Sequence, residues 1–246
     1  RVLLGLLRTD GGTATLLGGD PWNDAPTLHR RLAYVPGDVN LWPNLTGGEA
    51  IDLLGRARGG LDPRRRAELI ERLDLDPRKK GRSYSKGNRQ KVALVAAFMT
   101  RPDVLLLDEP TAGLDPLMEA EFQAIAREAS ERGQTLFLSS HILDEVEDLC
   151  HRVAILRKGR LVEVSALQDL RKLSTTELEA SFTGDVPDLS RLPGVTRTTS
   201  EDHTVRLTVV GSPAPVLAEL AAAGVTRLRS HEPSLEEIFL TYYEEP

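Results

Sequence analysis

The sequence contains a single cysteine, Cys150, which excludes an internal disulfide and suits a reducing compartment. Long apolar runs are missing as well. The run Val92–Met99 is far shorter than the roughly 20 residues that cross a bilayer, so any membrane connection must come through a partner. Basic residues are not in excess, and the net charge of −6 lacks the footprint of a nucleic-acid-binding protein. We therefore expect no nucleic-acid partner.

Four apolar residues, Val104–Leu107, predict a short strand that is buried on both faces, as in a parallel sheet. Asp108 and Glu109 close this strand, and Pro110 ends it. Ligands of open α/β sheets bind at this carboxyl edge. Two buried acids at this position need a cation, a hydrogen-bond donor or water. Taken alone, the two acids are also compatible with a strand that simply ends in solvent.

The chain of 246 residues is long enough for one large or two modest domains. Strand and helix patterns alternate up to about residue 165, which predicts right-handed βαβ crossovers and an α/β domain over residues 1–165. Within it we expect a helical subdomain at about residues 46–100, with helices over residues 49–58, 63–73 and 87–100. Thr46 and Glu49 have the capping-box spacing at the start of the first of these helices. The other expected elements are helices over residues 3–7, 116–132 and 143–150, strands over 13–19, 32–35 and 135–139, and a hairpin over 153–164.

The composition changes after residue 165. Residues 166–246 show the order β-α-β-β-α-β, which predicts a small α+β ferredoxin-like domain. Its helices are expected over residues 187–192, 214–223 and 234–243, in addition to a short helix over 166–173 that precedes its first strand.

Three motifs carry a family resemblance. The string D-E-P-T-A-G-L-D, residues 108–115, resembles the Walker B motif and D-loop of ABC-type ATPases. The string Y-S-K-G-N-R-Q-K, residues 84–91, resembles their signature, although Tyr84, Lys86 and Asn88 depart from its common form. Residues 139–141, S-S-H, resemble the switch-histidine loop. The resemblance implies a P-loop NTPase (RecA-like) fold that binds ATP and Mg²⁺.

The resemblance also implies the roles of single residues. Asp108 is expected to bind Mg²⁺, Glu109 to act as the general base, and His141 to hold the γ-phosphate. Asp115 is expected to cross a dimer interface in the D-loop, although it could also cap the helix that follows. The signature residues expected to contact the partner copy's nucleotide are Ser85, Lys86, Gly87, Asn88 and Gln90.

Two departures from the family pattern bear on the ATP site. Gly37 occupies the place where the family usually carries the glutamine of the Q-loop, so Asp38 or a bound water substitutes, or the contact is dispensable. The phosphate-binding pattern G-x-x-x-x-G-K-[ST] does not occur in the 246 residues. We expect that the sequence begins just after this motif, and that these residues alone bind ATP poorly. A naturally degenerate, nucleotide-free protein is the alternative.

The C-terminal residues 231–243 resemble the tail of ATPase subunits of type-2 ABC exporters, the drug-resistance group. This resemblance implies a homodimeric, energy-coupling ATPase of a bacterial exporter for drug, antibiotic or lipid-like substrates. Such a protein works on a membrane-spanning permease at the cytoplasmic face of the plasma membrane. The alternatives are a non-transport ABC ATPase and a catalytically inactive scaffold.

Overall fold

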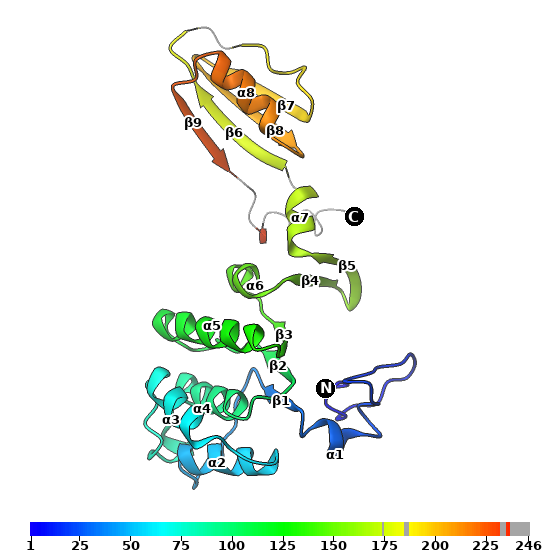
Figure 1. The fold of residues 1–246 in the computed structure, drawn as a ribbon, viewed down its shortest axis with the longest axis vertical. Coiled ribbons are helices and arrows are strands. Elements are labelled where there is room, and N and C mark those ends of the chain that lie inside the picture. The colour runs from blue at the N-terminus through cyan, green and yellow to red at the C-terminus, as the bar shows by residue number, and fades with distance from the viewer. Residues whose placement is uncertain (174, 185–186, 232–234, 237–246) are drawn as a thin grey trace. The chain divides into compact units, whose positions relative to one another are not determined.

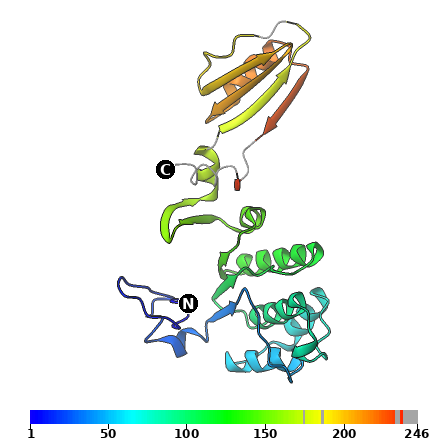
Figure 2. The ribbon, with the colours of Figure 1, turned by 180° about the vertical axis from the view of Figure 1, so that it is seen from behind.

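The computed structural model describes residues 1–173, 175–184, 187–231 and 235–236. The chain divides into two compact units, Arg1–Leu149 and Cys150–Pro246 (Figures 1 and 2). The domain division expected at residues 165 and 166 lies after this boundary and stays a prediction. None of the described helices is long and apolar enough to cross a membrane.

The first unit is built on a three-stranded parallel sheet with the order β1-β2-β3. The central strand is β2, so its backbone is paired on both sides and all four of its apolar residues are buried. The predicted parallel sheet and its buried central strand are therefore confirmed. The three strands are β1 (Leu32–Val35), β2 (Val104–Asp108) and β3 (Thr135–Ser139).

The three helices predicted between residues 46 and 100 are present. The first of them begins with a capping box, in which Thr46 accepts a hydrogen bond from the Glu49 amide and the Glu49 carboxylate accepts one from the Thr46 amide. The helices of the first unit are α1 (Ala25–Leu28), α2 (Gly47–Ala57), α3 (Pro63–Arg72), α4 (Lys86–Phe98), α5 (Pro116–Glu131) and α6 (Leu143–Leu149), with a 3₁₀ turn, η1, at Gly81–Ser83.

The two faces of the sheet are covered differently. On one face, Val35, Leu105 and Leu107 join a core that includes most of α4 and the buried side of α5, where Phe122 is almost fully buried. The opposite face of β1 and β2 packs against leucines of the N-terminal segment. Because all three strands run in the same direction, their carboxyl ends meet at one edge.

Two predictions for the N-terminal segment are wrong. Residues 3–7 form turns rather than a helix, because a short leucine run without a capping residue is a poor helix nucleus. Residues 13–19 contain only an isolated bridge between Leu16 and Gly19. Leu17 and Gly18 between them have φ values of 51° and 82°, as in a tight hairpin turn.

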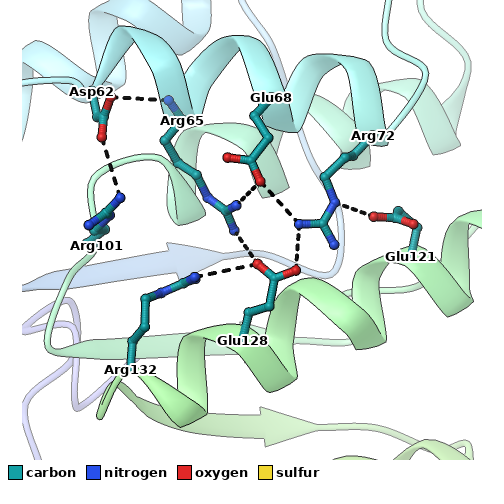
Figure 3. A network of polar contacts seen from close by, with 8 residues as sticks. All are labelled: Asp62, Arg65, Glu68, Arg72, Arg101, Glu121, Glu128 and Arg132. Atoms are coloured by element: carbon teal, nitrogen blue, oxygen red, sulfur yellow. Dashed lines mark hydrogen bonds and ion pairs between the residues drawn. The ribbon is translucent and has the colours of Figure 1, made fainter.

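An ion-pair network joins α3 to α5 (Figure 3). Arg65 of α3 is buried, and it pairs with Glu68 on its own helix and with Glu128 of α5. Arg72 reaches the same carboxylate of Glu128 at 2.7 Å. Glu128 therefore joins two arginines of one helix to the other helix. The network consists of Asp62, Arg65, Glu68, Arg72, Arg101, Glu121, Glu128 and Arg132.

Glu128→Gln should lower the free energy of unfolding at neutral pH by about 1–2 kcal/mol, since both arginines keep other partners. Burial alone raises the pKa of Glu128, but the hydrogen bonds and charges of Arg72 and Arg65 outweigh burial and lower it overall. A lowered folded-state pKa stabilises the protein above the unfolded-state pKa, and this stabilisation is lost as pH falls through the folded-state value. In urea titrations, the difference between wild type and variant should shrink in acid. The exposed Glu131→Gln on the same helix is the control.

In the second unit, a hairpin and a short helix precede a four-stranded antiparallel sheet with the order β7-β8-β6-β9. This is the strand order expected for the predicted ferredoxin-like domain. A single core unites one face of the sheet with Val216 and Leu220 of α8. The elements are β4 (Arg152–Arg157), β5 (Arg160–Ala166), α7 (Leu167–Leu173), β6 (Thr175–Ser181), β7 (Val195–Glu201), β8 (Thr204–Val210), α8 (Ala214–Ala222) and β9 (Arg227–His231).

The helix predicted over residues 187–192 is absent, although Leu189 is buried in the core. Asp188 accepts hydrogen bonds from the amide and the hydroxyl of Ser190, and this local turn competes with a helix. The helix predicted over residues 234–243 lies almost wholly outside the described residues.

Candidate active site

Asp108 lies at the carboxyl end of β2, directly opposite Ser139 at the end of β3. The Ser139 hydroxyl donates a hydrogen bond of 2.6 Å to one Asp108 oxygen, and the Tyr34 hydroxyl lies 3.5 Å from the other. Burial, together with the negative charge of Asp108, raises the pKa of Tyr34. The Asp108 carboxylate is therefore held between hydroxyl groups of the two neighbouring strands.

Glu109 follows Asp108 in a left-handed conformation, with φ at 45°. This conformation is strained for a non-glycine residue. The Glu109 amide donates to the Ser139 carbonyl at 2.9 Å, which fixes the backbone of the turn. His141 Nδ1 lies 3.3 Å from Glu109 Oε1, and the two side chains are 71% and 47% exposed. So exposed a pair adds little stability, and both side chains are open to a substrate.

The signature segment forms the beginning of α4. Ser85 is its N-cap and accepts a hydrogen bond of 3.3 Å from the Asn88 amide. The Asn88 side chain also donates to the Ser85 hydroxyl, at 3.2 Å. Ser85 and Lys86 are exposed, so the start of this helix faces solvent. The first amides of a helix have no acceptor within the helix, and together with the positive end of the helix dipole they favour an anion such as a phosphate.

Gly87 lies against the D-loop. A Cβ atom added at Gly87 would lie 2.3 Å from the Gly113 carbonyl oxygen, so only glycine allows this contact. Gly113 itself has a φ of 83°. Asp115, at the end of the D-loop, caps α5 by accepting a hydrogen bond of 3.1 Å from the Met118 amide. The capping role considered for Asp115 is thus confirmed, and its role at an interface stays a prediction.

Gln90 is buried in α4, with 1% of its surface exposed, and its amide donates to the Pro110 carbonyl at 3.0 Å. So buried a side chain does not face a nucleotide, and this corrects the expectation that Gln90 contacts one directly. Pro110 directly follows Glu109. Gln90 therefore joins the signature helix to the turn that carries the two acids.

Gly37 packs against the same turn. A Cβ atom at Gly37 would lie 3.3 Å from the Asp108 carbonyl oxygen and 3.7 Å from Glu109 Cβ. Asp38 beside it is exposed. The loop that follows β1 therefore reaches the acidic turn, as expected for the position of a Q-loop. Whether Asp38 replaces a glutamine there stays a prediction.

Two participants at this edge were missed in the sequence. Ser139 was noted only as part of the S-S-H string, although its place at the end of a strand parallel to β2 could have indicated that it lies opposite Asp108. Tyr34 lies on β1, and its neighbour across the sheet is Leu106, two residues before Asp108. Its contact with Asp108 depends on side-chain reach, for which the sequence gives no signal.

The residues at the edge fit a magnesium ion that accompanies a phosphate. Mg²⁺ prefers oxygen ligands and is usually held by one or two carboxylates together with substrate phosphates and water. Asp108, with the hydroxyl groups beside it, offers this chemistry. Within the described ranges, no group of three or more His, Cys, Asp or Glu residues could hold a metal by protein ligands alone.

Comparison with known proteins gives consistent matches. The family model of the ABC transporter matches residues 1–112, and that of the ATP-binding protein DrrA1-3-like, C-terminal domain matches residues 165–243. An uncharacterized ABC transporter ATP-binding protein of Alkalihalophilus pseudofirmus is 33% identical, over 98% of this chain and 92% of its own. The daunorubicin/doxorubicin resistance ATP-binding protein DrrA of Streptomyces peucetius is 31% identical, over 98% and 78%. A solved ATP binding subunit of an ABC transporter superposes with a TM-score of 0.64 and 30% identity, over 69% of this chain and 73% of its own.

Proposed function

Since this chain belongs to the ABC transporter ATP-binding proteins, we propose that it is the ATP-hydrolysing, energy-coupling subunit of a bacterial exporter. The observation that carries the proposal is the meeting of Glu109 and His141, 3.3 Å apart, beside Asp108 at the carboxyl edge of the sheet. The C-terminal match and the similarity to a daunorubicin/doxorubicin resistance protein support a drug, antibiotic or lipid-like substrate.

We propose that two copies work head to tail on a membrane-spanning permease, at the cytoplasmic face of the plasma membrane. In this arrangement Glu109 and His141 of one copy face the signature residues of the other. The exposed start of α4 supports this, because Ser85 and Lys86 are open to solvent there and a helix start favours a phosphate. The permease selects the transported substrate.

The chemistry follows from the positions of the side chains. The Glu109 carboxylate accepts a proton from the attacking water. The oxygen of that water forms a bond to the γ-phosphorus, and the bond from the γ-phosphorus to the ADP oxygen breaks. The contact of His141 Nδ1 with Glu109 leaves Nε2 for a γ-phosphate oxygen. Asp108, backed by Ser139, would hold Mg²⁺, which neutralises phosphate charge. Ser85, Lys86, Gly87 and Asn88 complete the site from the partner copy.

His141→Ala tests this proposal in the complete protein assembled with its permease. We expect the rate of phosphate release to fall by about 10²-fold or more, with a smaller change in KM, because the side chain acts on the transferring group. His151→Ala, which removes another exposed histidine, is the control and should keep wild-type turnover. Equal rates in both variants would contradict the catalytic role of His141. A wild-type rate that does not respond to the permease would contradict energy coupling.

A further inference from the structure

A buried carboxylate lies behind the switch-histidine loop. Glu145 belongs to α6 and is only 3% exposed. Its Oε2 accepts a hydrogen bond of 2.8 Å from the Ser140 hydroxyl, while its Oε1 has no hydrogen-bond partner among the described residues. Burying a carboxylate with so few partners is costly, and an apolar side chain would avoid that cost. Packing alone therefore does not account for Glu145.

Ser140, the partner of Glu145, shapes the turn that carries His141. The Ser140 hydroxyl accepts a hydrogen bond of 2.9 Å from the Ile142 amide. The hydroxyl thus accepts a hydrogen bond from the residue after His141, and its own hydrogen bond to Glu145, at 2.8 Å, is shorter than the 3.3 Å to the alternative acceptor, the Ile142 carbonyl. A serine that bonds to the amide two residues on closes a tight local turn. His141 is the residue enclosed by that turn.

Helix α6, which carries Glu145, is fixed to the rest of the first unit. Helix α6 packs against α5, and Arg127 of α5 lies 3.8 Å from Asp148 of α6. The Glu145 carboxylate is therefore held more firmly in place than the exposed loop that carries His141. The bond from Ser140 to Glu145 transfers this fixed position to the turn of His141.

We propose that Glu145 is a positioning residue for hydrolysis, which holds the His141 turn through Ser140 so that the imidazole stays against Glu109. Glu145 contacts neither nucleotide nor water. Its effect passes through two hydrogen bonds and one peptide to the 3.3 Å contact between His141 and Glu109. This inference rests on the proposed function, because it assigns to Glu145 a part in the reaction of His141.

The test is a set of variants of the complete protein with its permease, assayed by phosphate release. Glu145→Ala should lower kcat by about ten- to hundredfold with little change in KM, because a misplaced catalytic group affects the chemical step. Ser140→Ala should have a similar effect, and the double variant should be no worse than either single variant. Glu145→Gln, which can still accept the Ser140 hydrogen bond, should recover most of the rate. Asp144→Ala, on the exposed side of the same helix, is the control.

The decisive comparison uses the His141→Ala background. If Glu145 acts through His141, Glu145→Ala should have no further effect there. An equal loss in both backgrounds would assign Glu145 a merely structural role and overturn the proposal. If Glu145→Ala does not fold by circular dichroism, Ser140→Ala carries the same comparison. Failure of the proposed function gives a different result. In that case His141→Ala would release phosphate at the wild-type rate, and none of the variants would change a rate that depends on the permease.

Discussion

Glu109→Gln is expected to lower steady-state ATP turnover by about 10²- to 10⁴-fold while ATP stays bound. Glutamine has nearly the same shape and preserves a contact with His141, but its amide cannot take a proton from water. The substitution therefore removes the base and leaves the neighbouring phosphate contacts in place. The left-handed backbone at Glu109, with φ at 45°, is held by the bond of its amide to Ser139, which does not depend on the side chain.

The measurement is a pair of assays on the complete protein with its permease. Phosphate release gives the turnover, and retention of radiolabelled ATP on a filter gives occupancy. The matched control is Glu131→Gln, an exposed acid at the C-terminal end of α5, which should leave both values unchanged. Undiminished turnover in Glu109→Gln would show that another group is the base.

Gly87→Ala is expected to have the second-largest effect. The new methyl group would lie 2.3 Å from the Gly113 carbonyl oxygen, a separation that real Cβ atoms do not reach. The obstacle is backbone rather than a flexible side chain, so the start of α4 and the D-loop must move apart. We expect a loss of about 1–3 kcal/mol of folding stability. A displacement of about 1 Å at the signature should also cost about 10²-fold in turnover.

Thermal denaturation and phosphate release of the same preparation measure these two effects. Gly11→Ala is the control, because an added Cβ atom there meets nothing within 4 Å. The prediction requires a lowered melting temperature and a lowered rate in Gly87→Ala, with neither in Gly11→Ala. A Gly87→Ala protein that keeps wild-type stability and turnover would contradict the contact between signature and D-loop.

The parts of the fold that could be predicted are those whose pattern is local. The buried strand Val104–Leu107 and the capping box at Thr46 are readable because side-chain periodicity and caps depend on neighbours in sequence. The succession of strands along the C-terminal part of the sequence followed from the same local signals. The position of Asp108 at the carboxyl edge of the sheet was also readable, because Asp108 and Ser139 each close a strand of one parallel sheet.

Most of the parts that could not be predicted depend on partners that are distant in the sequence. Gln90 belongs to a motif that suggests nucleotide contact, but its amide is directed into the protein by the Pro110 carbonyl. Glu145 looks like any acid of a short helix until its burial is known. The helix expected over residues 187–192 gave way to a side-chain turn at Asp188 while Leu189 kept its place in the core. In the first two cases a tertiary contact decided the outcome, and in the third a local side-chain turn outweighed the helical pattern.

The composite nature of the ATP site is the central claim, and mixed dimers test it. Ser85→Asp keeps a good N-cap for α4 but sets a negative charge against the partner's phosphates. Two differently tagged copies, one Glu109→Gln and one Ser85→Asp, are purified together with the permease. In a head-to-tail dimer, this pair contains one site with both defects and one intact site.

The deciding measurement is the rate of phosphate release from that mixed dimer, compared with dimers of each single variant. We predict a rate well above both, and near-complete loss when one copy carries both substitutions and the other is wild type. A site contained within one chain would give the reverse. The dimer with one substitution in each copy would then be inactive, and the dimer with both substitutions in one copy would keep the activity of its wild-type copy. That reversed pattern would contradict the account.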